Sequence, residues 1–152
     1  MGLLDQILSL GDKNKDKKII GKEVREFLSV PPREMVENFI TALLEKSAER
    51  GLEIIQTAVD ENLDIKMFLK LILRDLRSML LLRLSPAMKK QMEEILGDRE
   101  FKFVDANKNA PKPGELENAL KILLDIYEVR GRSYLPQLPL ELAFLKIIGQ
   151  NQ

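Results

Sequence analysis

The sequence predicts an all-α protein, and three observations support this. Hydrophobic residues make up 45% of the 152 residues, which is ample for a packed core. Leucine occurs 27 times and valine 6 times, and aromatic residues are only 5%, so local preferences favour helix over strand. The apolar residues also recur at helical spacings of three and four. We therefore expect a helical bundle.

A short helical pair is expected at the start of the chain. Helices are predicted over about residues 3–10 and 21–29, with a polar loop over residues 12–18 between them. The first helix stops at a glycine, which suits a left-handed cap, and Pro31-Pro32 ends the second. This pair is the first predicted unit, residues 1–30.

Six further helices are expected in the second unit, residues 31–149. Each is predicted from apolar residues on one face and from capping or breaking residues at its ends. Their expected starts are Pro32, near Gly51, Ile65 after an N-cap at Asp64, Pro86, Glu115 and Pro139. The helix from Ile65 runs for about twenty residues and is the expected central core element. Residues 97–114 are rich in Asp, Asn, Pro and Gly, so a long exposed loop is expected there.

Composition excludes several classes of function. Lys plus Arg and Asp plus Glu each number 24, so no global field attracts polyanions. Without Cys or His, the chain lacks thiol nucleophiles, imidazole bases and nearly all zinc or copper sites. No phosphate-binding loop or nucleophile elbow occurs, so an independent enzyme is the least expected class. Residues 65–84 carry too many charges for a membrane span and no secretory signal is seen, so a cytoplasmic location is expected.

One loop resembles a calcium-binding site in the spacing of its oxygen ligands. The residues at positions 1, 3, 5 and 12 of such a loop are Asp12, Asn14, Asp16 and Glu23. Position 6, where glycine permits the sharp turn, is Lys17, and three more lysines surround the ion position. A solvated loop between two helices is the plainer interpretation, and a calcium-responsive helical regulator is the alternative.

Two other segments are candidate contact surfaces. A basic stripe along one edge of the expected central helix recurs at spacings of four, four and three and consists of Lys66, Lys70, Arg74 and Arg77. It could meet a phosphate backbone or an acidic subunit, or it could be a solvated flank. Residues 132–140 place apolar groups in a proline-rich loop, which packs either on a partner or on the chain's own core.

Three blocks of sequence, in this order and spacing, resemble a known family. They are Leu3-Leu4-Asp5-Gln6 followed by Lys22 to Leu28; Phe68-Leu69 with Leu73-Arg74-Asp75-Leu76-Arg77 and Leu80-Leu81-Leu82; and Leu140 to Lys146. Over nearly its whole length the chain resembles part of the gamma/tau subunit of the bacterial DNA polymerase III clamp loader. The resemblance implies that residues 1–30 are the end of an AAA+ lid and residues 31–149 a collar domain. Residues 97–114 have no counterpart in that pattern.

The resemblance also implies a role in assembly. Collar domains of five subunits form a ring, so the implied partners are other clamp-loader subunits, namely gamma/tau, delta and delta prime, and further copies of this chain. Apart from the resemblance, the basic stripe is the candidate for a weak DNA contact, and the charges of residues 65–84 leave no membrane partner expected. The resemblance implies that the chain begins after the sensor arginine of the family. This fragment is therefore expected to hold no cofactor and to be no enzyme. In the family, ATP binds to the domain that precedes the lid. The extension specific to the tau form is not expected within residues 1–152. The expected interface residues are Arg74, Arg77, Leu116, Leu120, Tyr127, Tyr134, Leu135 and Leu138.

Overall fold

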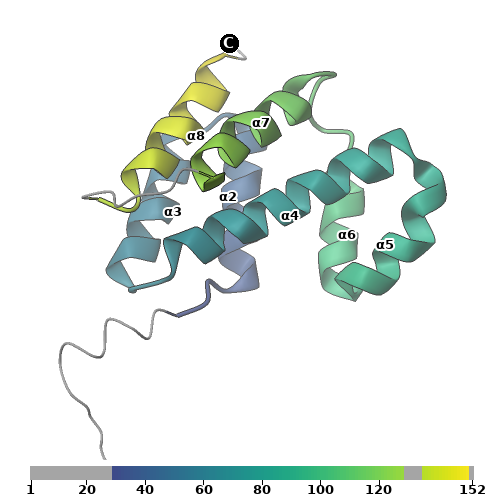
Figure 1. Cartoon of the computed structure of the whole chain (residues 1–152), viewed down its shortest axis with the longest axis horizontal. Coiled ribbons are helices and arrows are strands. Elements are labelled where there is room, and N and C mark those ends of the chain that lie inside the picture. The colour runs from purple at the N-terminus through teal and green to yellow at the C-terminus, as the bar shows by residue number, and fades with distance from the viewer. Residues whose placement is uncertain (1–28, 129–134, 151–152) are drawn as a thin grey trace, which may run out of the picture.

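The computed structural model describes residues 29–128 and 135–150 and shows an all-helical fold (Figure 1). These residues are 81% helical, and the part of the chain described has no strand beyond an isolated parallel bridge between Ser29 and Leu63. The all-α prediction is confirmed. The predicted first helical pair and the calcium-like loop with Asp12, Asn14, Asp16 and Glu23 lie outside the described residues.

The longest helix, α4, runs through the middle of the molecule (Figure 1). The elements in chain order are α2 (Arg33–Glu45), α3 (Ala48–Asp60), α4 (Ile65–Leu84), a 3-10 turn (Pro86–Met88), α5 (Lys89–Leu96), α6 (Asp98–Asn107), α7 (Glu115–Glu128) and α8 (Leu138–Gln150). Helices α3 and α8 lie towards the N-terminal end of α4, whereas α5 and α6 fold back beside its C-terminal end. None of the described helices is both long and apolar enough to cross a membrane.

The core is built on one side of α4, as its apolar spacing predicts. Phe68, Ile72 and Leu76 are at most 2% exposed, and the same row continues to the end of the helix. The ring of Phe39 on α2 lies with its centroid 5.4 Å from that of Phe68 and 5.1 Å from that of Phe144 on α8. These three rings join α2, α4 and α8 into one core.

Side-chain caps fix the starts of two of these helices. The carboxylate of Asp64 accepts a hydrogen bond from the backbone N–H of Met67 at 3.1 Å, which confirms the predicted N-cap of α4. The hydroxyl of Ser47 accepts in the same way from the N–H of Arg50. Helix α3 therefore starts at Ala48, three residues before the glycine near which its start was expected, and Gly51 lies within the helix.

The predicted long loop over residues 97–114 is wrong in its first half. Residues Asp98–Asn107 form α6, whose Phe101 and Val104 are buried against the rest of the core. The backbone of Gly97 has a φ of 84°, so the chain turns sharply from α5 into α6 without a loop. Acidic residues in the first turn also suit the positive end of the helix dipole. The Asp, Asn, Pro and Gly residues of this segment produce a loop only after α6 ends at Asn107.

Helix α8 approaches α3 more closely than any side chain at position 51 would allow. A Cβ built on Gly51 would lie 2.0 Å from the tip of the Phe144 ring. Phe144 is fully buried and also contacts Phe39, so its ring has no free space to move into. The absence of a side chain at Gly51 is therefore a packing requirement of the bundle.

Replacing Gly51 by alanine tests this contact. We expect Gly51→Ala to lower the free energy of unfolding by about 1–3 kcal/mol, because overpacking outweighs the gain in helix propensity. The matched control is Gly149→Ala in α8, where an added Cβ meets nothing within 4 Å. That variant should be unchanged or slightly more stable. Urea unfolding followed by circular dichroism measures both, and equal effects of the two variants would contradict the packing argument.

Candidate functional site: an apolar face on α8 and a basic stripe on α4

Helix α8 is apolar on almost every side although it lies at the surface. Its sequence from Leu138 to Gln150 contains one acidic and one basic residue, Glu141 and Lys146. The inner side packs in the core through Leu140, Ala143, Phe144, Ile147 and Ile148, each at most 4% exposed. A helix that is apolar all round is ordinarily covered on all sides. The outer side of α8 is therefore the part of the helix that needs explanation.

The outer side of α8 is a row of leucines. Leu138, Leu142 and Leu145 are 41%, 59% and 39% exposed. Their spacings are four and three, the spacing by which one helix packs against another in a coiled-coil seam. Gly149 continues the row and leaves open space where a side chain would lie. We call Leu138, Leu142 and Leu145 the α8 apolar face.

A groove between α7 and α8 extends this surface. Its volume is about 270 Å³, and its walls are Ile122, Ile126, Pro139, Leu142 and Ala143, with Asp125 and Lys146 also at its edge. Leu124 on α7 is a further exposed leucine, at 45%. An apolar centre with charged residues beside it is the usual anatomy of a protein–protein interface.

The structure places the predicted interface residues of α7, α8 and the segment between them differently from one another. Leu135 and Leu138 are both 41% exposed, and Leu138 belongs to the α8 apolar face. Leu120 and Tyr127 are half-buried at the edge of the core. Leu116 is 2% exposed and packs in the chain's own core, so it is not available to another subunit. Tyr134 lies outside the described residues.

The basic stripe on α4 is exposed along its whole length. Lys66, Lys70, Arg74 and Arg77 all point away from the core. Arg74 is held by Glu100 at 3.2 Å and also donates to the carbonyl of Ile95 at 3.4 Å. The ammonium of Lys66 lies 5.2 Å from the centre of the Tyr127 ring, a cation–π contact.

The chain was also compared with known proteins. It matches no protein-family model and no curated protein.

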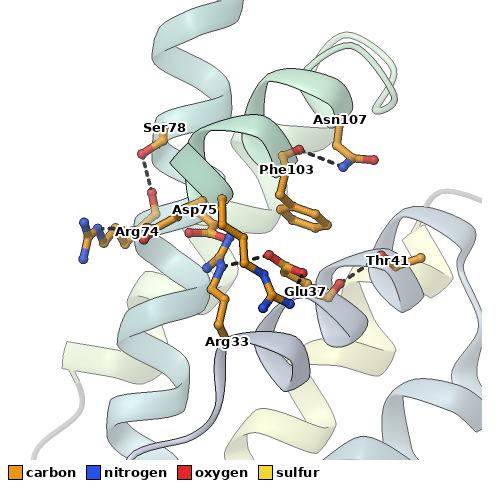
Figure 2. Close-up of polar contacts among 10 residues, drawn as sticks. Arg33, Glu37, Thr41, Arg74, Asp75, Ser78, Phe103 and Asn107 are labelled. Atoms are coloured by element: carbon orange, nitrogen blue, oxygen red, sulfur yellow. Dashed lines mark hydrogen bonds and ion pairs between the residues drawn. The ribbon is translucent and has the colours of Figure 1, made fainter. Parts of the chain in front are cut away.

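Behind the basic stripe, α4 buries a polar cluster that joins it to α2 and α6 (Figure 2). The carboxylate of Asp75 is fully buried and forms an ion pair with Arg33 of α2 at 2.5 Å. Arg33 also pairs with Glu37 at 3.0 Å, and its guanidinium carbon lies 5.5 Å from the centre of the Phe103 ring on α6. A single arginine thus contacts three helices.

Burial raises the pKa of Asp75 to about 6. The nearby Arg33 acts in the opposite direction and lowers the pKa, while the carboxylate of Glu100 adds to the rise. One oxygen of Asp75, Oδ1, has no hydrogen-bond donor among the described residues. Arg33 therefore compensates only part of the cost of removing this carboxylate from water.

The raised pKa of Asp75 fixes the sign of a pH dependence. The folded carboxyl holds its proton up to a higher pH than in the unfolded chain, where the pKa is near 3.8. Its contribution to stability is therefore greatest below that value and is lost as the pH rises through about 6. The unfolding free energy of the native chain relative to Asp75→Asn should increase by about 1 kcal/mol from pH 7.5 to pH 5.

Urea unfolding of both proteins at the two pH values measures this difference. The control is Asp125→Asn, the same change at an exposed position. A difference for Asp75→Asn that stays constant would show that the buried carboxyl does not titrate in this range.

Sequence reasoning missed Leu124, Leu142 and Leu145. The block that holds the last two was noted only for its family resemblance. The available signal was that α8 has two apolar rows, one of which the core cannot use.

Proposed function

We propose that this chain is the collar domain of a bacterial clamp loader of the gamma/tau type and that it holds the subunits together in a ring. The α8 apolar face carries this proposal, because a row of exposed leucines at helix-packing spacing is a surface that needs a partner. The sequence resemblance supports it independently. The implied partners are further gamma/tau chains and the delta and delta prime subunits.

The strength of each contact follows from the size of this face. Burying a leucine fully contributes about 1.5–3 kcal/mol, and the leucines of the α8 apolar face are already half covered. Association costs about 4–15 kcal/mol in lost freedom of motion, so one such contact alone gives weak binding. A closed ring gives every subunit two contacts, and linked contacts reinforce one another. We therefore expect assembly that depends on concentration.

The proposed role is mechanical and not chemical. Helices packed across subunits give a rigid platform, against which nucleotide-driven movements of other domains are transmitted to a sliding clamp. The all-helical architecture with a continuous core from α2 to α8 suits such a platform. ATP binding and hydrolysis are assigned to a preceding domain of the subunit.

Sedimentation velocity over a wide range of concentrations tests the proposal. We expect the chain to shift from monomer to a discrete oligomer of about four or five chains as the concentration rises. Leu142→Lys should abolish the shift, because it places a charge in the middle of the α8 apolar face. The matched control is Leu84→Lys, since Leu84 is 68% exposed at the end of α4, away from that face.

Circular dichroism checks that both variants keep the helix content and melting temperature of the native chain. A native chain that stays monomeric at the highest concentration would contradict self-assembly. A native oligomer that Leu142→Lys and Leu84→Lys affect equally would contradict the assignment of the interface to α8.

A further inference from the structure

The exposed side of α4 carries positive charge without any negative charge. Five basic residues occur along this helix, and its one acidic residue, Asp75, is fully buried with Arg33. The chain as a whole has a net charge of zero, so this helix concentrates charge that the rest of the molecule balances elsewhere. The result is a local excess of positive charge on an otherwise neutral protein.

Three of the cations in the basic stripe have no carboxylate partner. Among the described residues Arg74 pairs with Glu100, whereas Lys66, Lys70 and Arg77 form no ion pair. Lys66 is positioned by the Tyr127 ring, which leaves its charge facing solvent. Three cations are thus available to an external anion.

The stripe is also straight and evenly spaced. Its four residues recur every three or four positions of one unbroken helix, so they span roughly 16 Å along the axis. A row of like charges on a rigid rod fits a polymer that carries one negative charge per monomer. An acidic protein surface interrupts its negative charge with other groups. A membrane would require an apolar face on this side, but the apolar face of α4 is buried in the core.

We propose that the basic stripe on α4 binds the phosphate backbone of single-stranded nucleic acid. The contact reads no sequence, because it consists of phosphate contacts and offers no base readout. The half-buried Tyr127 at one end is the aromatic group available beside the stripe, so stacking adds little. Binding should therefore be electrostatic and sensitive to salt.

Fluorescence anisotropy of a labelled oligothymidylate with the full chain tests the proposal. Three phosphate contacts on a single strand predict a slope of about −2 for the logarithm of affinity against the logarithm of salt concentration. Affinity should then fall about 20-fold between 50 and 200 mM salt. Absent or salt-independent binding would overturn the proposal.

A matched pair of triple variants separates the stripe from bulk charge. The stripe variant combines Lys66→Gln, Lys70→Gln and Arg77→Gln, and we expect it to lose nearly all of the binding and of the salt slope. The control combines Lys89→Gln, Lys90→Gln and Lys102→Gln, which removes the same charge from exposed positions of α5 and α6. It should bind within about threefold of the native chain, since it keeps all three phosphate contacts. Equal losses in both variants would overturn the proposal.

Two further measurements identify the ligand and guard against misfolding. Lys66→Arg with Lys70→Arg keeps the charge and should keep the affinity, while circular dichroism confirms that the stripe variant is folded. Polyglutamate and phosphatidylserine vesicles, matched in charge concentration to unlabelled oligothymidylate, should compete at least tenfold less well. Equal competition by either would overturn the assignment to nucleic acid. Leu142→Lys, which acts on the α8 apolar face, should bind normally, so this test is separate from the test of assembly.

Discussion

The arrangement of the helices depends on the burial of a single carboxylate. Asp75 lies on the inner side of α4 among buried residues that are apolar except for Ser78, and a charge there is tolerated only beside a counter-charge. Arg33 meets this requirement from the first turn of α2, and its guanidinium also lies against Phe103 of α6. The orientation of three helices therefore follows from one electrostatic constraint. The same constraint removes the negative charge of α4 from its outer side.

The two candidate surfaces have opposite chemistry and lie on different elements. The outer side of α8 is apolar and suits another helix, whereas the outer side of α4 is cationic and suits a polyanion. Both surfaces arise because each helix packs only one of its sides against the core of the bundle and leaves the other side exposed. The exposed side of α4 is charged and is readily solvated, whereas the exposed side of α8 is apolar and is not. Of the two, the α8 surface is the stronger sign of a permanent partner.

A helix could be predicted from the sequence when many of its residues follow the same apolar periodicity. Helix α4 was predicted together with its N-cap, because a run of apolar residues at helical spacing over about twenty positions is compatible only with a helix. Helix α6 was missed because its segment is rich in turn-forming residues, while contacts of Phe101, Phe103 and Val104 with distant residues decide its structure. The exposed basic stripe on α4 was predicted from the helical spacing of its four residues alone. The two apolar rows of α8 are visible in the sequence, but the sequence does not say which of them faces inward, so the residues of the exposed face were missed.

The contact between Gly51 and Phe144 has a consequence for how the protein is made. The ring that fills the space beside α3 belongs to the helix that the ribosome synthesises last among those described. Until α8 emerges, α2 and α3 have no Phe144 to pack against, and apolar surface stays exposed to other molecules. Folding of the bundle is therefore completed late. A nascent chain stopped before α8 would be a substrate for chaperones and proteases rather than a smaller stable domain.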